Sequence, residues 1–169
     1  MQYQITTSRL LIEPLQLSDN NFILELVNTK GWLDFIGDRN LHSQEDVTAY
    51  IDKINNNQNV KYWVVKLNDT NTSIGIITLI KRNYLQHHDI GFAFLPNYFG
   101  KGFAYEATKA VLQNIAHQHT HFLAITISAN TNSINLLKKM GLIFDKSIVE
   151  NGEELQIWRM RVENIYTLS

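Results

Sequence analysis

Apolar residues recur with a helical or an extended period in successive parts of the chain, and this pattern predicts its elements. The stretch TTSRLLIEPL predicts a first strand that ends at Pro14. Ser18 and Asp19 are suitable caps for a short helix that follows it. A second helix is predicted over residues 43–54, where a capping box begins at Ser43 and apolar residues return every three or four positions.

From Val60 onward the apolar pattern changes to the period of strands. Three runs rich in β-branched and aromatic residues follow one another, with turn-rich segments between them: VKYWVVKLN, SIGIITLIKR and HDIGFAFLP. This arrangement predicts an antiparallel meander. The third run is apolar on both alternations, as in a central strand covered on both faces, and Pro96 ends it.

The last part of the chain alternates helix and strand before a closing hairpin. A helix is predicted after Gly102, with a face of small residues that begins at Ala104. The run HFLAITIS is the next strand, and a helix over residues 133–140 is stopped by Gly141. Asn-Gly within ENGEE predicts a turn that joins LIFDKSIV to LQIWRMRV. The order β-α-α-β-β-β-α-β-α-β-β therefore predicts a mixed α/β (α+β) fold.

Composition and charge limit the class of protein. The 169 residues are 44% apolar and 18% charged, which predicts one domain over residues 1–169. The net charge of −1 gives no basic field for nucleic acid or an anionic membrane. The start resembles no signal peptide and no apolar run reaches the roughly 20 residues of a membrane span, so we expect a cytoplasmic protein. Cysteine is absent, which excludes disulfides and a cysteine nucleophile, and no His, Asp and Glu spacing indicates a metal site.

The most informative stretch is PNYFGKGFAYEA, in which Gly100 and Gly102 precede a predicted helix. Such helix N-termini bind phosphate, because unpaired N–H groups point outward and glycine lets the backbone come close. A Walker P-loop requires Ser or Thr after Gly-Lys, and here Gly102 follows Lys101. A dinucleotide fingerprint requires a third glycine where the chain has Tyr105. A tight turn that only caps the helix remains an alternative.

The context of the loop supports a third phosphate-binding interpretation. The stretches DIGFAFLPNYFGKGFAYEA and ANTNSINLLKKMGLIF, in this order, resemble the GCN5-related N-acetyltransferase (GNAT) superfamily. The similarity extends from TSRLLIEPL through WLDFIGDRN to the final hairpin, and it is greatest to the branch containing the ribosomal-protein alanine N-acetyltransferases. The resemblance implies the acyl-CoA N-acyltransferase fold, a mostly antiparallel twisted sheet with helices on both faces. It also implies an acyltransferase that uses acetyl-CoA as co-substrate.

The resemblance implies a coenzyme A site along the same stretch. The superfamily signature Gln/Arg-x-x-Gly-x-Gly/Ala falls on residues 99–104, with Phe99 at the Gln or Arg position. Backbone N–H groups there would hold the pyrophosphate, and main chain around residues 92–95 would bind the pantetheine arm like an added strand. An N-x-x-S pattern would place two further side chains beside the pantetheine and the thioester sulfur. The implied coenzyme-binding residues are Phe94, Leu95, Phe99, Gly100, Lys101, Gly102, Phe103, Ala104, Asn130 and Ser133.

Acetyl transfer requires a neutral amine, an oxyanion donor and a proton for the leaving thiolate. We expect a backbone N–H near Phe94 or Leu95 to stabilise the oxyanion. The resemblance puts the usual acid, a tyrosine, at Leu137, so Ser133 or water would protonate the thiolate. Asp89 opens the central strand and is the candidate base, directly or through water. The alternatives are that Ser133 only caps its helix and that Asp89 is a solvated carboxylate.

The sequence thus predicts an N-acetyltransferase in which a primary amine attacks acetyl-CoA directly in a ternary complex, since no cysteine can carry the acyl group. The acceptor is either a protein N-terminal α-amine or a small-molecule amine. The protein is either a monomer or a homodimer. A catalytically silent acyl-CoA-binding module is the alternative, because the usual tyrosine is missing. A nucleotide-binding switch is a third interpretation.

Overall fold

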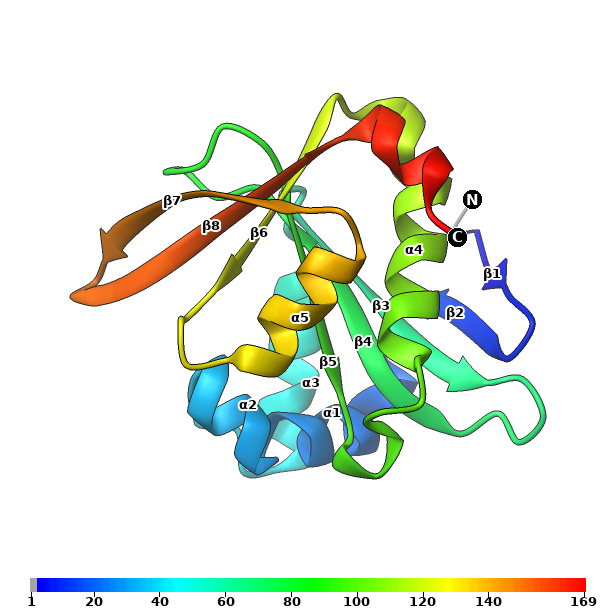
Figure 1. Cartoon of the computed structure of the whole chain (residues 1–169). Coiled ribbons are helices and arrows are strands. Elements are labelled where there is room, and N and C mark those ends of the chain that lie inside the picture. The colour runs from blue at the N-terminus through cyan, green and yellow to red at the C-terminus, as the bar shows by residue number, and fades with distance from the viewer. Residues whose placement is uncertain (1–2) are drawn as a thin grey trace.

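The computed structural model describes residues 3–169, in which one eight-stranded sheet carries helices on both faces (Figure 1). The strands lie in the order β1-β2-β3-β4-β5-β6-β8-β7, and all neighbours are antiparallel except β5 and β6. The strands are β1 (Ile5–Thr6), β2 (Leu10–Pro14), β3 (Val60–Leu67), β4 (Ser73–Ile80), β5 (Asp89–Phe94), β6 (His121–Thr126), β7 (Ile143–Glu150) and β8 (Glu153–Arg161). The α-helices are α1 (Asn20–Val27), α2 (Lys30–Phe35), α3 (Gln44–Asn55), α4 (Phe103–Ile115) and α5 (Thr131–Lys139).

The meander and the closing hairpin are confirmed as predicted. Strands β3, β4 and β5 pair in antiparallel fashion, so that Tyr62, Thr78 and Gly91 lie in one row across them. A 3-10 turn that begins at Pro96 follows β5 directly. The Asn-Gly turn between β7 and β8 has positive φ angles at both residues, 52° at Asn151 and 78° at Gly152, because this geometry suits the twist of a hairpin.

The N-terminal part differs from the prediction in two places. The first strand is a pair, β1 and β2, because a tight turn in which Thr7 N donates to Leu10 O at 2.9 Å divides it. A helix that we did not predict, α2, precedes the expected second one. It has only six residues, too few to show a helical period, although Thr29 caps it by accepting a hydrogen bond from Trp32 N.

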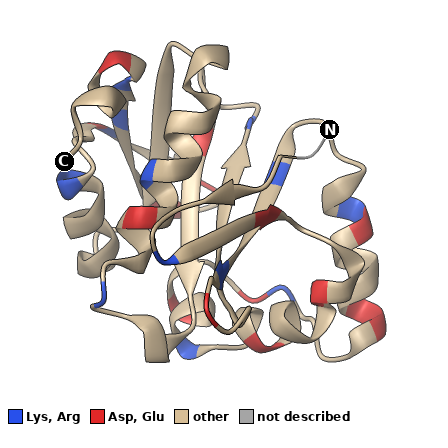
Figure 2. Cartoon of the chain, turned by 90° about the vertical axis from the view of Figure 1, so that its right-hand side faces the viewer, with Lys and Arg blue, Asp and Glu red and all other residues tan. Residues whose placement is uncertain are grey.

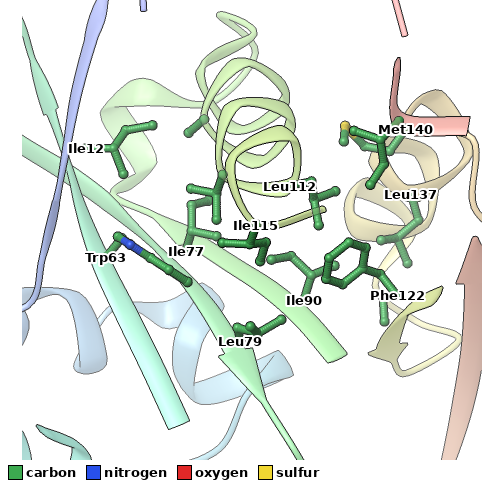
Figure 3. Packing of buried hydrophobic residues seen from close by; sticks show 14 of the residues in the cluster. Ile12, Trp63, Ile77, Leu79, Ile90, Leu112, Ile115, Phe122, Leu137 and Met140 are labelled. Carbon is green, nitrogen blue, oxygen red and sulfur yellow. The ribbon is translucent and has the colours of Figure 1, made fainter. Parts of the chain in front are cut away.

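Two apolar clusters lie on opposite faces of the sheet. One packs α4 and α5 onto the strands, with Leu112 and Ile115 above Ile90 and with Leu137 beside Phe122 (Figure 3). The other packs α1, α2 and α3 onto the opposite face and includes Trp32, Val47, Ile51, Ile76 and Leu95. Since side chains alternate along a strand, β5 contributes to both clusters.

The charge distribution agrees with the composition. In the view of Figure 2, Lys and Arg are interspersed with Asp and Glu over the elements, and neither sign gathers on one side. Within residues 3–169, no helix has the length and apolarity needed to cross a membrane.

Candidate active site

The parallel strands β5 and β6 separate soon after they begin. Their register contains one pair, Asp89 with Leu123, and Leu123 N donates to His88 O at 2.9 Å. Beyond this point β6 turns away from β5 toward α5 (Figure 1). The two strands therefore form a splay that is closed at Asp89 and open toward the far end of β5.

The edge of β5 that faces the splay has free main-chain groups. On the other edge, Leu95 N donates to Ile74 O at 2.9 Å, which fixes the direction of hydrogen bonding along the antiparallel β4–β5 pair. Because this direction alternates by residue, Gly91 and Ala93 face β4, whereas Phe92 and Phe94 turn their N–H and C=O groups toward the splay. An extended ligand can therefore pair with Phe92 and Phe94.

This geometry corrects the expected oxyanion donor. The N–H of Leu95 is bound to the carbonyl of Ile74, so it is not available to a ligand. Of the two candidates, Phe94 alone keeps a free N–H on the splay side. The sequence could not decide between them, because the direction of a backbone N–H depends on register and not on residue type.

The glycine loop adopts a conformation that requires glycine. Gly100 and Gly102 have φ angles of 71° and 79°, in the left-handed region, and Gly102 is the N-cap residue of α4. Phe99 is 55% exposed and Lys101 is also exposed, while Ala104 packs partly against the core. The N-terminus of a helix of thirteen residues thus opens to solvent at the open end of the splay, with bare backbone in front of it.

A hydrogen-bonded brace holds this loop against the N-terminal hairpin. Glu106 accepts from the Thr7 hydroxyl at 2.6 Å and from Arg9 Nε at 2.6 Å. Arg9 Nη1 in turn donates to the carbonyl of Lys101 at 2.9 Å, and the guanidinium lies 4.4 Å above the Phe103 ring. Sequence reasoning missed this brace, because Arg9 lies 97 positions before Glu106.

Breaking the brace should destabilise the fold in a pH-dependent way. Burial raises the pKa of Glu106, but the hydrogen bonds from Thr7 and Arg9 outweigh burial and hold this pKa below its ordinary value. The stabilisation is therefore present above the ordinary carboxyl pKa and is lost as pH falls through the lowered one. Glu106→Gln should lower the free energy of unfolding by about 2 kcal/mol at pH 7. Urea unfolding measures the loss, and the exposed Glu154→Gln is the matched control, which should change little.

Asn130, and not Ser133, caps the start of α5. The side chain of Asn130 caps the helix by accepting from Ser133 N at 3.2 Å, so the alternative that Ser133 is the cap is wrong. The half-buried Ser133 hydroxyl has no hydrogen bond to any residue in the described range 3–169. The helix also begins earlier than predicted, at Thr131. The serine hydroxyl thus remains available to a ligand at the open end of the splay.

Asp89 lies at the closed end of the splay and is buried. It is 3% exposed, so the alternative of a solvated carboxylate is wrong, and Arg82 Nε donates to its Oδ2 at 2.7 Å. Burial raises the pKa of Asp89, and Arg82 opposes part of this increase. Asp89 and Phe94 are five residues apart on β5, or about 17 Å. Within residues 3–169, no hydrogen bond joins Asp89 to Ser133.

The residue at the place of the usual catalytic acid is part of the core. Leu137, at the usual place of the acid, is 1% exposed and lies in the core. Within residues 3–169, no group of three or more His, Cys, Asp or Glu side chains has the arrangement of a metal site.

The family of the chain follows from two comparisons. A family model described as an acetyltransferase (GNAT) domain matches residues 9–143. A relative from Bacillus subtilis (strain 168), named "Uncharacterized N-acetyltransferase YnaD", is 30% identical over 155 residues, which cover 89% of this chain and 90% of the relative. The chain therefore belongs to the GNAT acetyltransferase family. It is an N-acetyltransferase.

Solved structures share the fold along almost the whole chain. The spermidine N-acetyltransferase from Vibrio cholerae, in complex with CoA and spermine, has a TM-score of 0.80 at 19% identity and covers 95% of this chain and 99% of that one. RimL, a ribosomal L7/L12 alpha-N-protein acetyltransferase in complex with coenzyme A, has a TM-score of 0.81 at 14% identity, covering 96% and 99%. The predicted GNAT fold is confirmed.

Proposed function

We propose that the protein transfers the acetyl group of acetyl-CoA to a primary amine, which attacks the thioester directly in a ternary complex. The observation that carries this proposal is the splay, whose free main-chain edge at Phe92 and Phe94 leads to the glycine loop before α4. A pantetheine arm contains amides that can pair with a strand edge, and a pyrophosphate suits a helix N-terminus. Direct attack is favoured because the chain has no cysteine to form a covalent intermediate.

In this proposal each end of the splay has its own task. Residues 99–104 hold the pyrophosphate, and the Phe94 N–H stabilises the oxyanion that develops on the thioester carbonyl. Asp89 lies about 17 Å along β5 from Phe94, so in this proposal it receives the proton of the amine through water molecules. The Ser133 hydroxyl or water supplies a proton to the leaving thiolate. Asn130 orders the start of α5 so that Ser133 keeps its place.

The acceptor is proposed to be a protein N-terminal α-amine or a small-molecule amine. Solved structures of this fold include an enzyme for spermidine and one for the α-amine of a ribosomal protein. An α-amine has a pKa of about 8, against about 10.4 for a lysine side chain, so a larger fraction of it is neutral at pH 7. Only the neutral amine has the lone pair required for attack.

A broad acceptor assay tests the proposed function. The purified protein is incubated with acetyl-CoA and with single amines: amino acids, polyamines, and peptides with free N-termini. We expect coenzyme A release that depends on one class of amine, together with a product heavier by one acetyl group. Coenzyme binding without release in the presence of any amine would instead support the silent acyl-CoA-binding module, for which the buried Leu137 is the specific argument.

Ser133→Ala should lower kcat more than it weakens coenzyme binding, because the hydroxyl contacts the sulfur in the proposed complex and does not cap the helix. Steady-state rates and coenzyme titration measure the two effects. Ser43→Ala is the matched control, since Ser43 does cap α3 by accepting from Asp46 N at 3.1 Å. It should lower stability by about 1 kcal/mol without changing kcat. Normal turnover in Ser133→Ala would remove Ser133 from the chemistry.

A further inference from the structure

Strand β7 forms one edge of the sheet, and within residues 3–169 it pairs only with β8. Figure 1 shows that the β7–β8 hairpin extends outward past the helices. All residues from Ile143 to Ser147 are exposed, and Val149 is 71% exposed. An edge strand of eight residues with exposed apolar side chains and no proline is a template on which another strand can pair.

The hairpin turn determines which peptide groups of β7 face outward. Residues 151–152 both have positive φ and form a two-residue turn, so Glu150 and Glu153 are the hydrogen-bonded pair that closes it. Hydrogen-bonded and non-hydrogen-bonded pairs alternate from there along the hairpin. Val149 and Ser147 therefore direct their N–H and C=O groups away from β8, toward the open edge.

The open edge has a definite length. The pairing of β7 with β8 shifts its register between Phe144 and Lys146, and such a bulge interrupts the regular edge. A regular edge is therefore present over residues 146–150. At the other end of the sheet, β1 has only two residues, too few to act as a template. The sheet can thus be extended by one short segment at one edge, which suits a closed pair of copies and not a filament.

The two ends of this segment carry opposite charges that have no partner in the chain. Lys146 is at one end and Glu150 is at the other, and neither forms an ion pair within residues 3–169. Glu150 lies directly opposite Glu153 across the hairpin, an arrangement of like charges that destabilises a strand pair. A cation on the open side of Glu150 would offset this repulsion, and a second copy of β7 can supply one.

We infer that two copies of the chain associate through β7, which pairs with the partner's β7 in antiparallel fashion around a two-fold axis at Ile148. In this register Ser147 exchanges main-chain hydrogen bonds with the partner's Val149, and Val149 does so with the partner's Ser147. Ile148 lies opposite the partner's Ile148. Lys146 lies opposite the partner's Glu150, and the symmetry repeats this pair of opposite charges at the other end.

The charges favour this register over its neighbours. With the axis at Ser147, the outward peptide groups also pair, but Lys146 lies opposite the partner's Ile148, and Glu150 lies opposite the bulged part of the partner strand. With the axis at Val149, Lys146 lies opposite the partner's turn. Only the axis at Ile148 combines free peptide groups with opposite charges at both ends of the segment.

Sedimentation velocity of the whole chain, over about 1 to 100 µM, tests the association. We expect a reversible monomer–dimer equilibrium with a dissociation constant in the micromolar range, because only one strand segment per copy becomes buried. Val149→Pro removes an outward N–H that β8 does not use, so the hairpin should persist while the dimer is lost. Thermal unfolding checks that this variant is folded. A wild-type protein that stays monomeric over the whole range would overturn the inference.

A charge exchange tests the register without altering the main chain. Lys146→Glu and Glu150→Lys each place like charges opposite one another at both ends, so each should raise the dimer dissociation constant about tenfold. The double variant Lys146→Glu/Glu150→Lys exchanges the two charges and should return the constant to near the wild-type value. Lys53→Glu, at an exposed position of α3, is the matched control and should leave association unchanged. A dimer that is insensitive to the single variants, or a double variant as weak as they are, would overturn the inference.

Discussion

Replacing Asp89 with asparagine should lower kcat/KM at its pH plateau by about 10²- to 10⁴-fold, the loss typical of removing a general base. The substitution keeps the size of the side chain but removes the buried carboxylate of Asp89 at the closed end of the splay. The wild-type profile should rise with pH until Asp89 is deprotonated. Because burial raises the pKa of Asp89, this rise should lie above the range of an ordinary aspartate.

The pH profiles of both proteins, measured with acceptors of different basicity, decide the role of Asp89. If the profile follows the pKa of each free amine and is the same in both proteins, Asp89 is not the base. Asp145→Asn is a suitable control, because Asp145 also pairs with an arginine, Arg159 at 3.3 Å, but lies on β7 away from the splay. It should leave the profile unchanged.

Gly102→Val should raise the dissociation constant for coenzyme A at least tenfold, or about 1.4 kcal/mol. Gly102 has a φ of 79°, which a β-branched residue rarely adopts, and a Cβ there would lie 3.4 Å from Arg9 Nη2. The loop must therefore change shape, and the N–H groups that we propose to bind the pyrophosphate should lose their common direction. Isothermal titration with coenzyme A measures the effect.

The hairpin turn provides a control for strain alone. Gly152 has nearly the same φ, 78°, and no atom lies within 4 Å of a Cβ built on it. Gly152→Val should therefore lower stability through the same backbone strain but leave coenzyme affinity unchanged. A folded Gly102→Val protein with wild-type affinity would remove the glycine loop from the coenzyme site.

The sequence predicted most elements of the fold because their apolar periods are long. In the meander, β3 and β4 have eight residues each, and α3 has twelve. The capping box at Ser43 also marks the start of α3 in the sequence. The errors concern short features. Helix α2 has six residues, and the turn at Thr7 divides the predicted first strand without a glycine or proline to mark it. Short elements depend on tertiary contacts more than on local pattern.

The candidate site was predictable where backbone conformation requires a residue type. Left-handed φ angles explain Gly100 and Gly102, so the loop was visible in the sequence. The sequence around Arg82 carries no such signal. Its ion pair with Asp89 depends on how the eight-residue connection between β4 and β5 folds. From the sequence we considered Ser133 as the cap of α5 and did not consider Asn130, although asparagine is an equally good N-cap residue.

The alternating direction of the peptide groups along β5 has a consequence for variation among related proteins. Every second residue of β5 forms its main-chain hydrogen bonds with β4, and the peptide groups of the residues between them face the splay. Which residues do which depends on the strand register alone. A substitution at Phe92 or Phe94 changes a side chain in the core but retains the peptide groups proposed to bind the coenzyme. Inserting or deleting one residue between Asp89 and Leu95 would exchange the two edges and turn each side chain to the opposite face. In this strand we therefore expect related proteins to contain substitutions far more often than insertions or deletions.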